Sequence, residues 1–488
     1  MRLAPGSLGR LPQDVRRPAY DRTGLDVGII HLGIGAFHRA HQALYTDTVL
    51  AAGDRRWSIT GVSLRSPPTR DALAPQHGLY TAAMRDADAE ELRVVGSIGS
   101  VLVAPEDPDA VLSVLCHPST RIVSLTITEK GYCHSPATGE LDEAHPEIVH
   151  DLSHPKRPRS APGFIVEAIA RRRASGLPAF TLLSCDNLPS NGATLRRIVT
   201  RFASLRDAEL GRFVGDALRF PSTMVDRIVP ATTAADRDHV AQRLGLRDAC
   251  PVMTEVFSQW VIEDEFGAGG RPDWALAGAT FARDVAPFEL AKLRLLNGSH
   301  STLAYLGWLA GHETVAEAMG APGFARLIRG MMDEEVTPEL PPIHDFDLGA
   351  YKDSLIDRFR NPALRHKTAQ IAMDGSQKLP QRLLDTVRSR LRRGAPFDRI
   401  ALGIAGWMRY AAGIDEAGRP IEVRDPLAEE IRRRSAGFRD PDRLLEAFMG
   451  LQTVFGQDLP ASAEFRAAVR SALSQLLSQG AARTVESF

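Results

Sequence analysis

The segment KLRLLNGSH, residues 292–300, places polar side chains in a stretch that otherwise has the apolar spacing of a buried helix. These polar residues are Lys292, Asn297 and His300. At about 100° per residue on an α-helix, they share with Glu289 an arc of roughly 140°. Leu296 and Leu303 fall within the same arc. The spacing therefore predicts a polar helix face that is not simply exposed to solvent.

A lysine on such a face suits acid-base chemistry. Burial without a counter-charge disfavours the ammonium form, and a neutral amine is a general base near neutral pH. Oxidation of an alcohol needs a base for the hydroxyl proton while hydride leaves the same carbon for a nicotinamide. Asn297 and His300 could donate to the oxygen as negative charge develops there. Spacing alone also allows a surface ion pair of Lys292 with Glu289, with Asn297 and His300 bonded to local backbone.

A glycine turn follows the first apolar run of the chain, in VGIIHLGIGAFHRAH, residues 27–41. In a dinucleotide-binding fold, Gly33 would permit the tight turn and Gly35 would let the backbone approach a pyrophosphate. A helix would then begin with Ala36 and Phe37. The third glycine of a full fingerprint is replaced by His38. Such a turn also occurs in α/β proteins that bind no dinucleotide, but its place after the first strand favours the cofactor.

The second apolar run ends with VSLR, residues 62–65, where an acidic residue would normally bind the ribose 2′-hydroxyl of NAD. No acidic residue is present there. Arg65 could instead meet the 2′-phosphate of NADP, or it could be a solvated loop cation. We expect NAD as the cofactor and do not exclude NADP.

Short apolar, β-branched runs alternate with helical stretches from about residue 26, a pattern typical of βαβ units and a parallel sheet. Strands are predicted near Val27–Leu32, Trp57–Ser63, Leu92–Val95, Arg121–Thr126 and Phe180–Ser184. Helices are predicted at 41–52 and 163–174, and the Pro-, His- and Ser-rich stretch 135–162 is predicted to be a surface loop. The fold class is therefore α/β, with a Rossmann-like N-terminal domain.

The pattern changes near Pro287, after which amphipathic helical stretches broken by Pro and Gly replace the strands. The predicted helices are 289–311, 324–335, 349–359, 381–393 and 462–478. We expect a dinucleotide-binding domain at residues 1–286 and an all-helical substrate domain at 287–488.

Composition excludes several classes of protein. The net charge of −1, without a block of like charges, argues against nucleic-acid or membrane-surface binding. No apolar run is long enough to span a membrane, and no signal peptide is recognisable. Four separated cysteines indicate a reducing cytoplasm, and neither Cys133-His134 nor the His38 and His41 pair gives a complete set of metal ligands.

Seven segments together resemble the mannitol dehydrogenase family of long-chain polyol dehydrogenases. They are HLGIGAFHRAHQALYTD, SLTITEKGY, SCDNLPSNG, FPSTMVDRIVP, QWVIEDEF, KLRLLNGSH and MDGSQKLPQR, and they run in the expected order from about residue 18 to the C-terminus. The resemblance implies a Rossmann-like domain, a helical domain and an active site in the cleft between them, without a catalytic metal. An idle nucleotide-binding protein and a metal-dependent dehydrogenase are the rival classes.

The resemblance also implies roles for individual residues. Lys292 matches the general base, and Asn297 and His300 match contacts to the substrate oxygen. Asn187 matches an asparagine that pairs with Asn297 to hold an oxyanion, and Glu289 matches a glutamate on the proton path. Two further matches are Asp226, expected beside the cofactor, and Lys378, expected to bind substrate.

Each of these matches has a simpler interpretation. Asn187 could form an Asx turn before Pro189, and Asp226 could pair with Arg227. Lys378 could be a charge at a helix C-terminus.

Cations near the predicted site favour an acidic substrate, because a buried carboxylate needs fixed positive charge. The segment NPALRHKTAQIAMDGSQKLPQR supplies Arg365, His366, Lys367, Lys378 and Arg382. Gln370 stands where mannitol enzymes are expected to carry an arginine. We therefore expect reversible hydride transfer between D-mannonate and D-fructuronate, with Arg365 binding substrate; the alternative is a mannitol or other polyol dehydrogenase. A monomer or weak homo-oligomer is expected.

Overall fold

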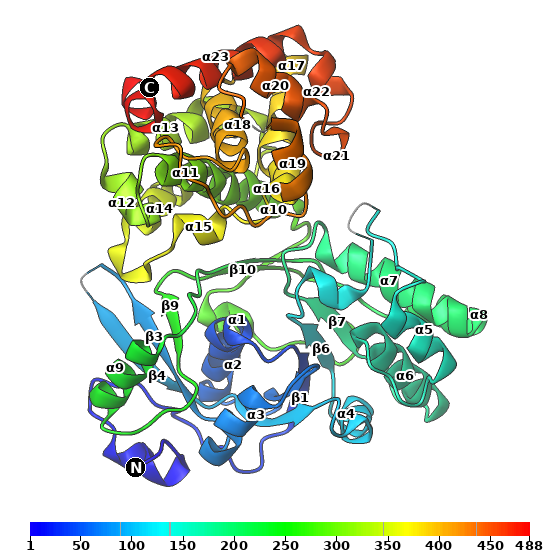
Figure 1. Ribbon diagram of the computed structural model, residues 1–488. Coiled ribbons are helices and arrows are strands. Elements are labelled where there is room, and N and C mark those ends of the chain that lie inside the picture. The colour runs from blue at the N-terminus through cyan, green and yellow to red at the C-terminus, as the bar shows by residue number, and fades with distance from the viewer. Residues whose placement is uncertain (88, 136–137, 345, 436) are drawn as a thin grey trace. The chain divides into compact units, whose positions relative to one another are not determined.

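The computed structural model describes residues 1–488 except 88, 136–137, 345 and 436. The chain divides into two compact units, Met1–Ala286 and Pro287–Phe488. Strands and helices alternate in the first unit, whereas the second is helical (Figure 1).

A five-stranded sheet in the order β5-β2-β1-β6-β7 forms the centre of the first unit, and every neighbouring pair is parallel. Its strands are β1 (Val27–Leu32), β2 (Ser58–Ser63), β5 (Ile98–Val103), β6 (Ile122–Leu125) and β7 (Thr181–Ser184). Every residue of β6 and β7 is buried, because helices cover both faces of such a sheet and the strands become continuous apolar runs. The predicted Rossmann-like fold with a mostly parallel sheet is confirmed.

Helices link these strands, and α7 packs beside β7 (Figure 1). The helices of this unit are α1 (Ala36–Ala40), α2 (Gln42–Ala51), α3 (Pro68–Leu73), α4 (Pro108–Leu115), α5 (Pro146–Ser153), α6 (Ala161–Ala174), α7 (Asn191–Arg206), α8 (Ala208–Ala217) and α9 (Ala234–Leu244). The prediction of a loop over 135–162 is wrong in part, because α5 lies within it. Pro146 begins this helix, where its missing N–H is not needed.

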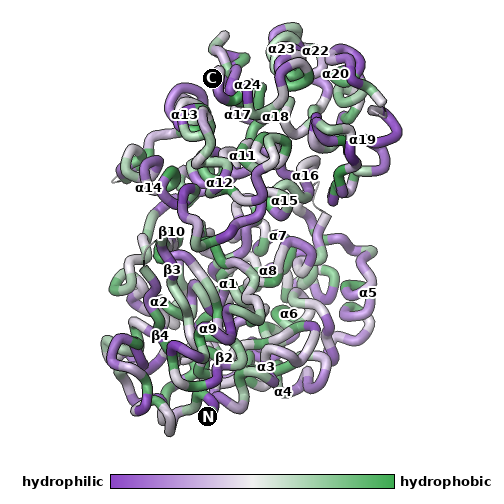
Figure 2. Tube along the Cα trace, turned by 60° about the vertical axis from the view of Figure 1, so that its left-hand side comes forward, coloured by the Kyte–Doolittle hydropathy of each residue, from purple (hydrophilic) through white to green (hydrophobic). Residues whose placement is uncertain are grey.

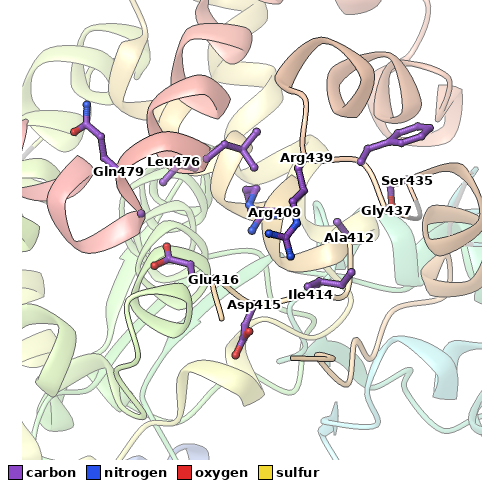
Figure 3. Close-up of a pocket in the computed structure, with 13 residues that line it drawn as sticks. Arg409, Ala412, Ile414, Asp415, Glu416, Ser435, Gly437, Arg439, Leu476 and Gln479 are labelled. Carbon is purple, nitrogen blue, oxygen red and sulfur yellow. The ribbon is translucent and has the colours of Figure 1, made fainter. Parts of the chain in front are cut away.

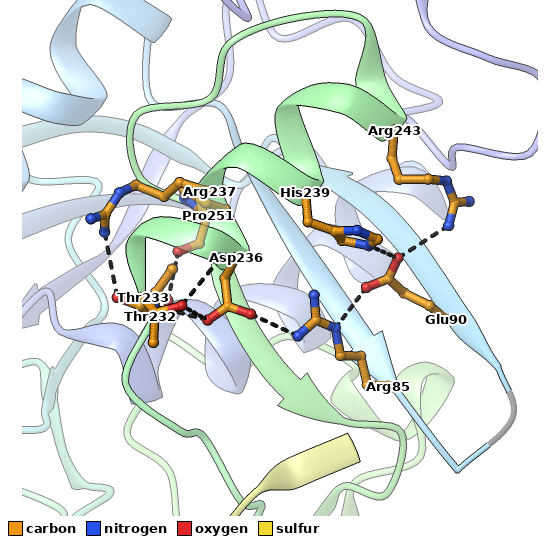
Figure 4. Close-up of polar contacts among 9 residues, drawn as sticks. All are labelled: Arg85, Glu90, Thr232, Thr233, Asp236, Arg237, His239, Arg243 and Pro251. Carbon is orange, nitrogen blue, oxygen red and sulfur yellow. Dashed lines mark hydrogen bonds and ion pairs between the residues drawn. The ribbon is translucent and has the colours of Figure 1, made fainter. Parts of the chain in front are cut away.

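Two smaller sheets complete the unit, in the orders β4-β3-β9 and β11-β10-β8. Their strands are β3 (Tyr80–Arg85), β4 (Glu90–Val95), β8 (Thr223–Asp226), β9 (Val252–Glu255), β10 (Gln259–Glu263) and β11 (Thr280–Ala282). Arg85 of β3 ties α9 to the first of them by donating to Glu90 at 2.7 Å and to Asp236 at 2.8 Å (Figure 4). His239 of α9 meets the second oxygen of Glu90 at 2.7 Å.

Helix α11 (Gly298–Leu309) is the core of the second unit, and every residue in it except Trp308 is buried. It packs against α18 (Asp398–Ala411), where Gly403 admits the Thr302 side chain. The other helices are α10 (Ala286–Ala291), α12 (Val315–Gly320), α13 (Phe324–Gly330), α14 (Leu348–Arg360), α15 (Thr368–Ile371), α16 (Gly375–Leu379), α17 (Asp385–Arg392), α19 (Ala428–Ser435), α20 (Pro441–Met449), α21 (Gln452–Phe455), α22 (Asp458–Ala461), α23 (Ala463–Gln479) and α24 (Ala481–Ser487). The described residues of this unit contain no strand, as predicted.

Three stretches of the second unit are π-helical: Lys292–Asn297, Met331–Val336 and Pro380–Leu384. Hydrophilic residues gather on outer helices such as α19, where only Ile431 and Ser435 are buried (Figure 2). Within the part of the chain that the structure describes, no helix has the length and apolarity to cross a membrane. All four cysteines are free thiols.

Candidate active site

The glycine turn after β1 has room for a ligand beside its backbone. Gly33 has a φ of +97°, and a Cβ there would lie 2.0 Å from the Thr126 carbonyl oxygen, so only glycine fits. A Cβ on the exposed Gly35 would meet only the Gly33 oxygen, at 3.9 Å. Ala36 and Phe37 follow, half-buried, in α1. A pyrophosphate can therefore approach this turn closely.

His38, at the position of the missing third glycine, is fully buried and stacks on His31 of β1 with ring centroids 3.5 Å apart. His31 is held on both sides, by the Ser124 hydroxyl and by the Thr126 hydroxyl, each at 2.8 Å. Burial lowers the pKa of His31 to about 3, so this ring is neutral at physiological pH. An imidazole stack replaces the close helix–strand packing that a glycine would give.

Arg65, just beyond β2, is exposed and forms an ion pair with Glu147 of α5. The hydrogen bond to this carboxylate raises the pKa of Arg65 above its usual value. A 2′-phosphate at this position would have to replace Glu147 as the partner of Arg65.

A group of potential metal ligands lies at the same place. Cys133, His145 and Glu147 each present a ligand atom, and these atoms lie within 4.8 Å of one another. The group belongs to the first unit and includes none of the residues predicted to act on the substrate.

Asn187 lies three residues beyond β7, at the edge of the parallel sheet where such folds bind ligands. It is exposed. Its neighbour Asp186 accepts hydrogen bonds from the Ile127 and Thr128 backbone at 2.9 and 3.1 Å and from Tyr132 at 2.8 Å. Burial raises the pKa of Asp186 to about 6. Asp186 was not predicted as a site residue, although it directly precedes Asn187 in SCDN.

Asp226, at the end of β8, is 3% exposed. Its pairing with Arg227 was one interpretation of the sequence. The Arg227 guanidinium donates to the backbone oxygens of Ala40, at 2.7 Å, and of Glu255, at 2.8 Å. These bonds join β8 to α1 and to β9.

The segment that carries the polar face is not the regular α-helix that the prediction assumed. Residues 292–297 are π-helical, with α-helix on either side. In a π-helix the hydrogen bonds join residues five apart, which therefore lie roughly above one another. Lys292 and Asn297 are five apart, so the π turn aligns these two side chains. The predicted angular positions are therefore wrong in this segment, although the shared face is retained.

Burial on this face argues against a solvated ion pair. Lys292 is 8% exposed and His300 is 7% exposed, while Glu289 and Asn297 are half-buried. Neither the Asn297 carboxamide nor the His300 ring hydrogen-bonds to any described residue, and the buried Nε2 of His300 has no partner there. The alternative in which both side chains bond to local backbone is not seen.

Several cationic or basic groups surround His300. Its pKa lies well below its usual value, first because of burial and then because of nearby His366, Arg358, Arg382 and Lys292. The His300 ring lies 5.1 Å from that of His366 and 4.6 Å from that of Phe359. The ring is therefore neutral in a locally positive environment.

Two π-helical segments meet beside this face. A Cβ on Gly298 would lie 3.0 Å from the Arg382 backbone oxygen, so glycine allows the close approach. The Arg382 guanidinium donates to the Ser301 hydroxyl at 3.1 Å and reaches the Asn297 carbonyl at 3.4 Å. Arg382 thus braces the start of α11.

The other predicted substrate cations differ in their surroundings. Lys378 donates to the backbone oxygens of Met373 at 2.5 Å and Ile371 at 3.4 Å. Lys367 pairs with Glu313 at 2.9 Å, and both side chains are exposed. Arg365 is exposed in a left-handed turn, with a φ of +45°.

Arg358 was missed by the sequence analysis although a signal was present. It lies on the buried face of α14 with Tyr351 and Leu355, at the spacing i, i+4, i+7. A charged residue on a face that is otherwise apolar indicates a partner or a function.

A cavity of about 280 Å³ also lies in the second unit, near the ends of α18 and α23 (Figure 3). Two of its acidic groups have structural partners, because Asp415 pairs with Arg419 and Glu416 accepts from the Ala481 backbone. None of the predicted site residues lines it.

Comparison with known protein families gives two matches. Residues 27–276 match the mannitol dehydrogenase Rossmann domain, and residues 284–477 match the mannitol dehydrogenase C-terminal domain.

Individual proteins match over almost the whole chain. D-mannonate oxidoreductase of Escherichia coli K12 is 48% identical over 96% of this chain and 97% of its own. Mannitol 2-dehydrogenase of Aspergillus fumigatus is 40% identical over 97% and 95%. Mannitol 2-dehydrogenase of Pseudomonas fluorescens, solved with NAD and D-mannitol, is 42% identical with a TM-score of 0.89 and coverage of 100% and 99%.

Proposed function

The chain belongs to the mannitol dehydrogenase family of oxidoreductases, and we propose that it interconverts D-mannonate and D-fructuronate with NAD as the hydride carrier. The Escherichia coli relative is named for mannonate, and the Pseudomonas fluorescens structure contains NAD. The open backbone at Gly35 is compatible with a dinucleotide.

The observation that carries the substrate assignment is the positive surroundings of His300. The guanidinium groups of Arg358 and Arg382 lie near its ring, and their positive charge lowers its pKa further. A neutral polyol gains little from such surroundings, whereas a sugar acid brings a carboxylate that needs them. We assign the carboxylate to this cluster, with Arg358 as its main partner.

The second unit supplies the groups for proton transfer in this proposal. During oxidation, Lys292 in its neutral form takes the proton of the reacting hydroxyl. Bound NAD would supply the acceptor for the hydride that leaves the same carbon. Asn297 and His300 donate to the oxygen as negative charge develops. Glu289, half-buried one turn before Lys292, passes the proton to solvent.

Further roles follow for the remaining residues. Gly33, Gly35, Ala36 and Phe37 form the cofactor turn. Asn187 offers a carboxamide at the sheet edge.

Asp226 and Arg65 contribute to the cofactor site. Lys378 donates to two backbone oxygens, which fix its ammonium group, and we assign this cation to substrate binding. Arg365 provides an exposed cation for the carboxylate.

Mannitol oxidation is the second candidate, because relatives named for mannitol also match nearly the full chain. Gln370 weighs against it. The resemblance expects an arginine there in enzymes that act on polyols.

A substrate panel tests the proposal. The purified protein is assayed in the reductive direction with NADH and NADPH, each against fructuronate, tagaturonate and fructose. We expect the highest kcat/KM with NADH and fructuronate. A higher value with fructose would replace the proposal with the mannitol alternative, and a higher value with tagaturonate would move it to the epimeric acid.

A further inference from the structure

Three side chains of the first unit come together outside the residues assigned to the reaction. Cys133 follows the short 3-10 turn after β6, His145 precedes α5, and Glu147 lies in the first turn of α5. The Cys133 sulfur lies 3.9 Å from a carboxylate oxygen of Glu147. The three potential ligand atoms are all within 4.8 Å of one another.

We propose that these residues form a binding site for a divalent metal ion of zinc type, with Cys133, His145 and Glu147 as ligands. A thiolate, an imidazole and a carboxylate are the three ligand types that zinc takes in proteins. Manganese and magnesium prefer oxygen ligands, so the sulfur and nitrogen select against them. With three protein ligands, the fourth position belongs to water.

The local backbone favours this arrangement. Cys133 has a φ of +51°, a left-handed conformation that a non-glycine residue adopts at some energetic cost. Its backbone is fixed on both sides, because its N–H donates to Lys130 and its carbonyl accepts from Asp142 at 2.9 Å. The turn is therefore held in the conformation that directs the sulfur toward α5.

The hydrogen bonds of the other two ligands are compatible with a metal. The His145 Nδ1 accepts from the Glu147 backbone N–H at 3.3 Å, so in the neutral ring Nδ1 carries the lone pair and Nε2 the proton. A metal would bind at Nδ1 in place of this long hydrogen bond. Glu147 is close enough to Cys133 for both to bind one ion after small side-chain movements.

Arg65 competes with the metal for Glu147. Its guanidinium forms the ion pair with this carboxylate, and its positive charge opposes a second cation nearby. Metal binding would therefore release Arg65 at the end of β2. This competition makes the arginine a sensitive probe of the site.

Cobalt titration of metal-free protein tests the proposal without any assay of turnover. Protein treated with a chelator and then freed of it is titrated with Co²⁺, and absorbance is recorded in the near ultraviolet and the visible. We expect a thiolate-to-cobalt charge-transfer band that saturates at one equivalent and is abolished by one equivalent of Zn²⁺.

Ligand variants identify the residues. Cys133→Ser removes the band, whereas Cys116→Ser, a change at a half-buried thiol elsewhere in the unit, leaves it. His145→Asn and Glu147→Gln each weaken Zn²⁺ binding by about tenfold or more in calorimetric titration. Circular dichroism spectra establish that each variant is folded.

The competition gives a test in the opposite direction. Arg65→Ala tightens Zn²⁺ binding, because it removes both the rival partner of Glu147 and a repulsive charge. Arg70→Ala is the matched control, since Arg70 is paired with Glu106 away from the site, and it leaves the affinity unchanged. No charge-transfer band in the wild type, or an equal band in Cys133→Ser, overturns the proposal.

Discussion

Two buried histidines in this molecule share a low pKa but differ in what surrounds them. His31 of β1 has hydroxyl partners at both ring nitrogens and lies in the core of the parallel sheet. His300 of α11 leaves its Nε2 without a partner among the described residues and is surrounded by cationic side chains. Burial alone therefore does not identify a functional group. The informative combination is burial with an unmet hydrogen bond and a one-sided local charge.

The largest expected effect on activity is that of replacing Lys292, which lies near His300. Replacing Lys292 by Ala removes the proposed base and should lower kcat about a thousandfold, within the range of general acid-base catalysis. Circular dichroism and thermal unfolding should show a folded protein. Steady-state kinetics in both directions measure the effect.

Lys352 is the matched control, because it is also a buried lysine of the second unit, is ion-paired with Asp333 and has no proposed part in the reaction. Lys352→Ala should lower stability and leave kcat unchanged. A Lys292→Ala variant that turns over at the wild-type rate would remove the proposed mechanism.

Replacing each of the two histidines by Ala tests the difference between them. His300→Ala should lower kcat about a hundredfold and should cost less stability than His31→Ala, because the Nε2 of its ring has no hydrogen bond to lose. His31→Ala should lower the free energy of unfolding by about 3 kcal/mol, since it leaves buried hydroxyls without a partner, and should preserve kcat per folded molecule. Denaturant unfolding and kinetics on both variants measure the two effects. Equal losses of kcat in His300→Ala and His31→Ala would contradict a functional difference between the two histidines.

A smaller effect, on KM, is expected from replacing Arg358, one of the cations near His300. Arg358→Met should raise KM for fructuronate about tenfold, the loss of one charge-assisted contact, and leave KM for fructose unchanged. Arg360→Met is the control, because Arg360 is exposed in the same helical turn. A parallel rise in KM for both substrates would mean that Arg358 has a structural role instead.

The smallest effect concerns pH. Because the pKa of His31 is about 3 in the folded protein and about 6.5 in the unfolded chain, the unfolded chain binds more protons between these values. This group therefore leaves stability unaffected above pH 6.5 and lowers it as pH falls toward 3, by about 1.4 kcal/mol per pH unit. His31→Ala should remove that slope from the difference curve. Chemical unfolding at pH 7, 6 and 5 tests it, and an unchanged slope would contradict the assignment to His31.

Much of the fold could be predicted because buried parallel strands have a simple pattern. β1, β2, β6 and β7 appear in the sequence as continuous apolar runs, and their predicted ends lie within one residue of the observed ones. Of the strands in the two smaller sheets only β4 was predicted, and β5, at the edge of the central sheet, was also missed. Helix α5 was missed because its proline and histidines have a loop-like composition.

The candidate site could be predicted in its residues but not in its geometry. Lys292, Asn297 and His300 stood out as polar residues among leucines. The π turn that aligns Lys292 with Asn297 leaves no mark in residue spacing, because a helix that widens by one residue keeps its apolar pattern on both sides. Arg358 lies more than fifty residues away in the sequence, so its proximity to His300 is a tertiary property.

The π turn at 292–297 contains one residue more than a regular α-helix needs for the same rotation. Five α-helical residues, at about 100° each, turn about as far as six π-helical ones, so deleting one residue would leave the helices on either side facing nearly as before. Lys292 and Asn297 would then be four residues apart, the ordinary spacing of side chains on one face of an α-helix. The orientation of the flanking helices is therefore insensitive to that one-residue change.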